Sequence, residues 1–71
     1  MTTQELIKKA ELRDAIFEAL SGNYSYAIKM GYDKKEQQGV LERAVPWKQE
    51  QGLIPYDVSP KAAVKEFFNR L

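Results

Sequence analysis

The sequence has no histidine and no cysteine among its 71 residues. Their absence excludes zinc sites built on these side chains, iron–sulfur clusters, thiol chemistry, Ser–His triads and disulfide bonds. Acid–base catalysis would have to use carboxylates, lysines or tyrosines. The carboxylates that share one helical face, Glu11, Asp14 and Glu18, have the spacing of a solvated helix edge. No glycine-rich phosphate-binding loop is present either. We therefore expect a protein without catalytic activity, cofactor or metal.

Long hydrophobic runs and an excess of one charge are missing as well. Eleven Lys and Arg residues are balanced by ten Asp and Glu, so the formal net charge is +1. This balance argues against a basic tail for nucleic acids and against a polybasic membrane patch. Uninterrupted apolar runs reach only two or three residues, too short for a transmembrane helix or for the apolar part of a signal peptide. We expect a cytoplasmic protein with no membrane partner.

The length of the chain allows one domain, which we expect to span residues 1–71. A chain of this size buries only roughly 60% of the surface that its unfolded form exposes, so its core is marginal. Without disulfides or a metal site, stability must come from helix packing, from a partner or from self-association. The size therefore favours a binding protein.

The first helix is the clearest element of the sequence. Thr2 or Thr3 can cap it, and Thr2-x-x-Glu5 fits a capping box. We expect the helix to run to about Leu20 and to end at Ser21-Gly22, with the glycine in the left-handed conformation. Its apolar arc is wider than one neighbouring helix needs. Either the helix is central and packed on two sides, which is the simpler interpretation, or part of it contacts another chain, for example in a dimer.

Breaking residues divide the middle of the chain. A short helix is predicted from Asn23 to Gly31, and a further helix begins at Asp33, which caps with Glu36. Pro46 disfavours helical backbone at the residue before it, so we expect this helix to end there. One more turn can follow over residues 47–51.

The stretch from Gly52 to Ser59 is expected to be an extended strap, because it contains Pro55 and precedes Pro60. Ser59-Pro60 is a strong helix start, with serine as N-cap and proline in the first turn. The apolar face of this last helix consists of Ala63, Val64, Phe67, Phe68 and Leu71. The sequence therefore predicts an all-α domain of three to four helices with one extended, proline-containing strap.

Tyrosine and tryptophan are distributed differently from phenylalanine. The phenylalanines occupy predicted core faces, whereas Tyr and Trp occur at predicted helix ends and turns. Tyr, Trp and Arg are the residue types enriched in binding hot spots. The sequence thus predicts a small protein-binding module that acts as an adaptor, inhibitor or accessory subunit. Its candidate contact residues are Tyr24, Tyr26, Tyr32, Arg43, Trp47 and Tyr56.

The alternative is a helix-turn-helix transcriptional regulator that binds DNA as a dimer. Ala27 and Gly31 have the spacing of the small residue and the turn glycine in that motif. The helix that follows would contact phosphates through lysines and base edges through glutamines. Its candidate DNA-binding residues are Lys34, Lys35, Gln37 and Gln38.

Two features weigh against the DNA hypothesis. Gln37 occupies a position where we expect Val, Ile or Leu to pack against the first helix of the motif. The net charge of +1 is low for a protein that must neutralise several phosphates. Protein binding is therefore the favoured hypothesis, with DNA binding as its alternative.

Overall fold

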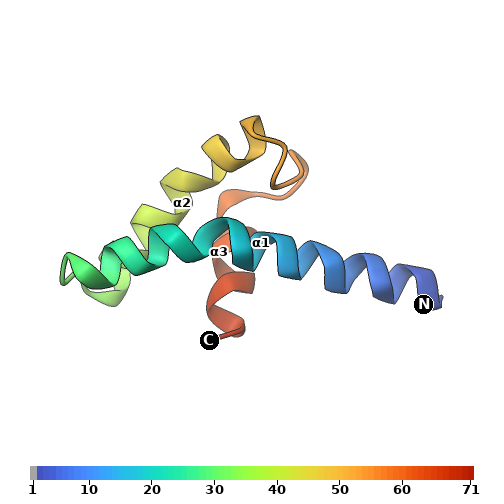
Figure 1. Ribbon diagram of the computed structural model, residues 1–71, viewed down its shortest axis with the longest axis horizontal. Helices are drawn as coiled ribbons and strands as arrows, with labels where there is room; N and C mark the ends of the chain where they lie inside the picture. The colour runs from blue at the N-terminus through green and yellow to red at the C-terminus, as the bar shows by residue number, and fades with distance from the viewer. Residues whose placement is uncertain (1) are drawn as a thin grey trace.

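Three helices make up residues 2–71, the part of the chain that the computed structural model describes. They are α1 (Thr3–Lys29), α2 (Lys34–Glu50) and α3 (Pro60–Asn69). Helix α1 spans the long dimension of the molecule, α2 returns beside its second half, and α3 crosses it near the middle (Figure 1). Each helix contacts the other two. The predicted all-α class is confirmed, and no strand occurs in residues 2–71.

Each helix begins where the sequence places a capping residue. The Thr2 hydroxyl accepts a hydrogen bond from the Glu5 amide (3.2 Å), and the Ser59 hydroxyl accepts one from the Ala62 amide (3.2 Å). Asp33 forms a complete capping box, in which its carboxylate accepts from the Glu36 amide (2.8 Å) and the Glu36 carboxylate accepts from the Asp33 amide (3.4 Å). These bonds satisfy amides that the helices themselves leave without partners.

The predicted end of the first helix at Ser21-Gly22 is wrong, and so is the separate short helix from Asn23. Helix α1 continues through Gly22, which does not have a positive φ. Leu20 and Ala27, seven residues apart on one helical face, are both fully buried. The Ser21 hydroxyl donates to the Phe17 carbonyl (2.6 Å) and so does not compete with the backbone bonds. Burial on both sides of Gly22 outweighs the local cost of glycine.

The predicted end of the second helix at Pro46 is also wrong. Helix α2 includes Pro46 and ends at Glu50. A proline inside a helix removes one hydrogen bond and costs roughly 3 kcal/mol. Val45 before it and Gln49 after it are both buried on the inner face of α2. This packing keeps the helix continuous, so Trp47 lies within α2 rather than in a break.

Residues 51–59 connect α2 to α3 through turns and bends, so the strap predicted from Gly52 to Ser59 is not extended. The buried Gln49 holds this segment in place, because its side-chain amide donates to the Pro55 carbonyl (3.0 Å) and to the Val58 carbonyl (2.8 Å). Ile54 inserts into the core, with 1% of its surface exposed. The segment thus closes the open side of the three-helix core.

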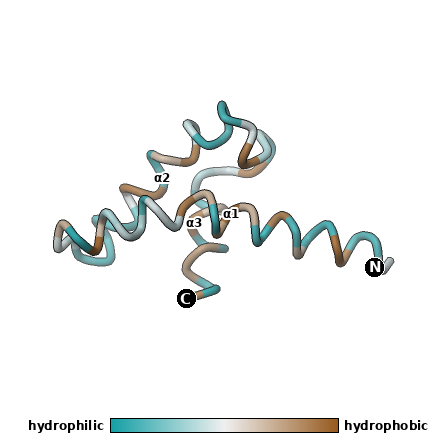
Figure 2. The backbone as a smooth tube through the Cα atoms, viewed as in Figure 1, coloured by the Kyte–Doolittle hydropathy of each residue, from teal (hydrophilic) through white to brown (hydrophobic). Residues whose placement is uncertain are grey.

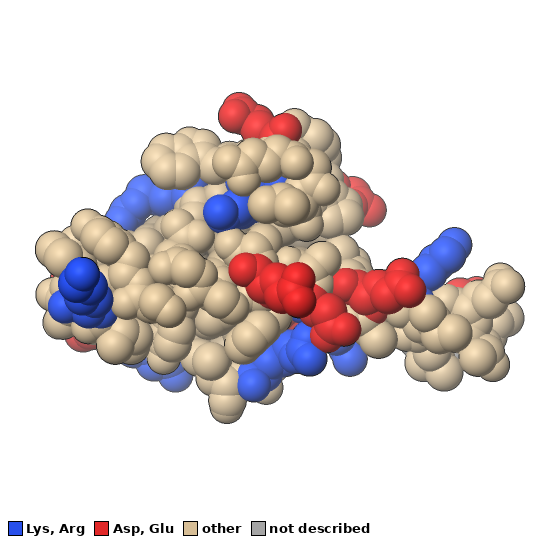
Figure 3. All heavy atoms as spheres, viewed as in Figure 1, with Lys and Arg blue, Asp and Glu red and all other residues tan. Residues whose placement is uncertain are grey.

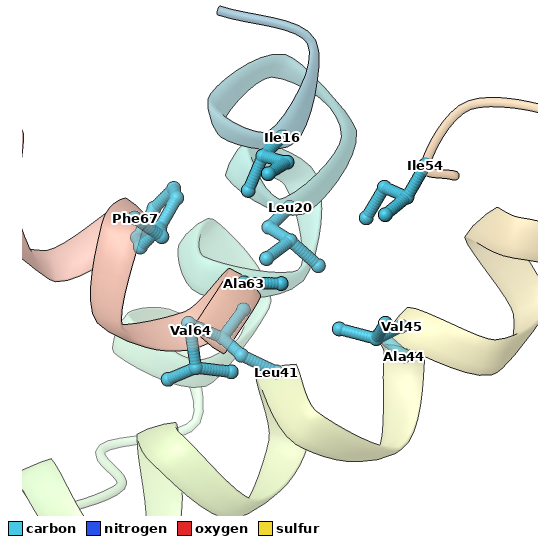
Figure 4. Close-up of a cluster of buried hydrophobic side chains, with 9 residues drawn as sticks. All are labelled: Ile16, Leu20, Leu41, Ala44, Val45, Ile54, Ala63, Val64 and Phe67. Atoms are coloured by element: carbon cyan, nitrogen blue, oxygen red, sulfur yellow. The ribbon is translucent and has the colours of Figure 1, made fainter. Parts of the chain in front are cut away.

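One hydrophobic core joins all three helices and the connecting segment (Figure 4). Its largest fully buried side chain is Phe67 of α3. The ring of Phe67 stacks on Phe17 of α1, with centroids 4.9 Å apart. The buried members of the core are Ile16, Leu20, Leu41, Ala44, Val45, Ile54, Ala63, Val64 and Phe67.

The first part of α1 lies outside this core. Every residue from 2 to 11 is exposed, and this segment, which we name the arm, projects beyond α2 and α3 (Figure 1). Apolar residues nevertheless continue along it, as the brown stretches near the N-terminus show (Figure 2). Leu6 is 55% exposed and Ile7 is 52% exposed. The rest of α1 contacts both α2 and α3, as predicted, whereas no residue of the arm belongs to the core.

Candidate protein-binding surface

Four of the six residues predicted to bind a protein converge on one hollow. Tyr26, Tyr32, Arg43 and Trp47 line a depression of about 370 Å³ between the end of α1 and the middle of α2. Its floor and edges are completed by Asn23, Val40 and Ala44. Three aromatic rings, one guanidinium and one side-chain amide thus face a single hollow of the size that binding pockets have.

Secondary structure fixes where these side chains lie. Gly31, with φ +78°, ends α1 in a Schellman motif, in which the Tyr32 amide donates to the Ala27 carbonyl (3.1 Å). This turn brings Tyr32 back toward Tyr26, and their rings meet edge to face with centroids 6.4 Å apart. Arg43 and Trp47 are four residues apart on α2, so they share one helical face.

The side chains that line the hollow are available to a partner. Trp47 is 67% exposed and Tyr26 is 52% exposed. Arg43 has no carboxylate within ion-pair distance in residues 2–71, and its guanidinium extends back over Gly39, 3.6 Å from where a Cβ on that glycine would lie. An exposed tryptophan beside an unpaired arginine has the composition of a binding hot spot.

A second depression of about 360 Å³ continues the first one along α2. The two share Tyr32, Val40 and Arg43 and therefore form one groove. The second depression adds Lys35 and Glu36 at its far end. We name the two depressions together the aromatic groove; its charged side chains are two cations and one carboxylate.

The other two predicted contact residues lie elsewhere. Tyr24 is half-buried, and its ring packs on Phe67 (5.2 Å between centroids) and Phe68 (5.9 Å). Tyr24 therefore belongs to the edge of the core. Tyr56 lies in the connecting segment, 75% exposed and outside the aromatic groove.

The four candidate DNA-binding residues do not share one face. Gln37 is partly buried, and its side-chain amide donates to the Tyr32 carbonyl (2.8 Å), which ties the turn to α2. Lys35 borders the aromatic groove. Lys34 and Gln38 lie on the opposite side, beside α3. Gln37 therefore has a structural partner, and the two lysines point to different surfaces.

Sequence reasoning missed three parts of this surface. It did not identify Asn23 and Val40 as groove residues, because neither is a residue type enriched in binding hot spots. It did not separate the arm from the rest of the first helix, because Leu6 and Ala10 continue the stripe of Phe17 and Leu20. No local signal therefore marks where burial begins along this helix.

Residues 2–71 contain no group of acidic side chains that could hold a metal ion. None of their helices combines the length and the apolar character that crossing a membrane requires. Comparison of the chain with known protein families, with curated proteins and with solved structures gave no match.

Proposed function

We propose that this protein is a non-catalytic binding module that holds another protein in its aromatic groove. The single observation that carries the proposal is the convergence of Tyr26, Tyr32, Arg43 and Trp47 on one hollow. These residues come from α1, from the turn that follows it and from α2, and none of them belongs to the hydrophobic core. The proposal fits an adaptor, an inhibitor or an accessory subunit.

The physical basis of the proposal is the exposed aromatic surface of the groove, which a partner would remove from water. Covering the exposed part of a large aromatic side chain contributes about 25 cal/mol for each Å² removed from water. Aromatic side chains also lose little conformational entropy on binding, because they have only two rotatable bonds. Arg43 adds a charge that can pair with a carboxylate of the partner and set its orientation.

The test is capture of the partner from a cell lysate with the tagged full-length protein, with and without nuclease. We expect one protein in near-stoichiometric amount, unaffected by nuclease, and we expect Trp47→Ala to abolish its capture. Tyr56→Ala is the matched control, since it removes an exposed aromatic ring outside the groove. Equal loss with both variants, or no loss with Trp47→Ala, would contradict the proposal.

DNA binding remains a second candidate, because one observation favours it. Lys34 and Gln38 of α2 border a depression together with Lys61 and Lys65 of α3. Three lysines therefore surround Gln38, although Glu42 lies in the same depression. Under this hypothesis Lys34→Ala with Lys61→Ala weakens retention on DNA and lowers its dependence on salt. Nucleic acid recovered from the lysate only without nuclease would support it over the protein-binding proposal.

A further inference from the structure

We propose that the arm of one molecule docks as a helix into the aromatic groove of a second copy. The inference rests on the proposed function, because it uses the same groove, but it names an occupant that the chain itself supplies. It accounts for two features at once: an apolar helical segment with nothing over it, and an apolar groove with nothing in it.

The arm has the pattern of a helix that binds in a groove. Thr3, Leu6, Ile7 and Ala10 are spaced i, i+3, i+4 and i+7, so they form one stripe on the helix. All four are exposed, because this part of α1 extends beyond α2 and α3 (Figure 1). The N-cap at Thr2 keeps this segment helical without tertiary contacts.

Charge complementarity favours the aromatic groove as the place where the arm binds. Glu11 lies one turn after Ile7, at the edge of the stripe, and has no ion-pair partner in residues 2–71. It begins the acidic edge of Glu11, Asp14 and Glu18, and acidic side chains form a row over the middle of α1 (Figure 3). The groove carries two cations, Lys35 and the unpaired Arg43, against one carboxylate, Glu36, so its charge is complementary to that of Glu11. With the stripe against Tyr26 and Trp47, Glu11 can pair with Arg43.

The contact must form between two molecules. The arm and Tyr26 belong to the same continuous helix, α1. A helix rises 1.5 Å per residue, which places Ile7 and Tyr26 about 28 Å apart along the axis. The arm therefore cannot fold back onto its own groove. A dimer joined by a single arm-in-groove contact keeps one free arm and one free groove from which chains can grow, whereas two copies that exchange arms around a twofold axis form a closed dimer.

The test measures the mass of the full chain in solution over a wide concentration range by light scattering after size-exclusion chromatography. One short helix in one groove is a small interface, below the roughly 1,200 Å² of total area that stable complexes bury, so association should be weak and should rise with concentration. We expect wild-type protein to reach dimers and longer species. An arm variant, Leu6→Gln with Ile7→Gln, and a groove variant, Trp47→Ala with Arg43→Glu, should each stay monomeric.

Mixing the two variants is the decisive step. The intact arm of the groove variant can enter the intact groove of the arm variant, so the mixture should give a 1:1 heterodimer and nothing larger. Tyr56→Ala is the control and should associate like wild type, and circular dichroism checks that each variant is folded. Wild-type protein that stays monomeric at every concentration would overturn the proposal. So would a mixture that does not associate, or a groove variant that still self-associates through its arm.

The same variants separate this inference from the proposed function. If only self-association fails, wild-type protein is monomeric while Trp47→Ala still loses the captured partner. If only the proposed function fails, the two variants form their heterodimer while capture from the lysate is unaffected by Trp47→Ala. Where both hold, an excess of the arm variant, whose groove is free, should capture more partner than wild type.

Discussion

The two parts of α1 follow the same helical rules but have opposite environments. From Leu12 to Ala27 the helix contacts α2 and α3 and contributes Ile16 and Leu20 to the core. From residue 2 to 11 all its side chains are exposed, and none belongs to the core. The sequence specifies a helix in both parts. Only the second part packs against other helices, and such packing supplies most of the stability of helices in proteins. The core around Phe67 therefore holds the fold, and the arm adds no buried side chain to it.

The largest expected effect comes from deleting the central ring of the core. Phe67→Ala removes a side chain that is 1% exposed and stacks on Phe17. Such a change costs about 3–5 kcal/mol, which is comparable with the whole stability expected for a chain of this length, about 4–10 kcal/mol. We expect the variant to be largely unfolded by circular dichroism at 37 °C. A cooperative transition near the wild-type temperature would show that the core lies elsewhere.

The next effect concerns the connection that closes the core. Gln49→Ala leaves the carbonyls of Pro55 and Val58 without their donor and opens a gap beneath the segment from 51 to 59. We expect a loss of about 1–3 kcal/mol in the free energy of unfolding, measured by urea denaturation. Gln51→Ala, at an exposed position in the next turn, is the control. Equal losses from the two variants would argue against the role given to Gln49.

Two glycines should respond in opposite directions to the same substitution. Gly52 has φ +76° at the end of α2, so Gly52→Ala forces an unfavourable backbone conformation and should cost about 1 kcal/mol or more. Gly22 lies inside α1 with open space around its Cβ position, so Gly22→Ala should stabilise the protein by about 1 kcal/mol. Thermal unfolding of both variants checks the pair. A destabilised Gly22→Ala would mean that α1 is interrupted there after all.

The smallest effect on stability is expected in the arm. Leu6→Gln with Ile7→Gln replaces two side chains that are each more than half exposed and lie outside the core. Glutamine forms helices at least as well as isoleucine, so the free energy of unfolding of the monomer should change by less than about 0.5 kcal/mol. Urea denaturation at low protein concentration measures this change. A loss of several kcal/mol would show that the arm packs against the body of the molecule.

The sequence predicted the caps and the buried face of the last helix, because these depend on short-range patterns. Asp33 with Glu36 and Ser59 with Pro60 begin helices as expected. The errors at Gly22 and Pro46 have one cause: both residues are local helix breakers, and both are flanked by residues that become buried. Tertiary packing exceeded the local cost at each position, and a single sequence does not show that packing.

The candidate site was predicted only in part, because its geometry also depends on tertiary packing. The residue types of Tyr26, Tyr32, Arg43 and Trp47 identified them as candidate contact residues, but their convergence depends on how α1 and α2 cross. Tyr24 has the same residue type and a neighbouring position, yet it faces Phe67 and Phe68. Two residues along a helix change the direction of a side chain by about 200°, so Tyr24 and Tyr26 lie on nearly opposite sides of α1.

The role of the aromatic groove is tested by comparing wild type with Trp47→Ala in two readouts, thermal unfolding and capture of a partner protein. Because Trp47 is 67% exposed, we predict a loss of less than about 1 kcal/mol in the free energy of unfolding together with complete loss of capture. Unfolding of the variant would place Trp47 among the groups that hold the fold. A folded variant that still captures its partner would remove the aromatic groove as the binding surface.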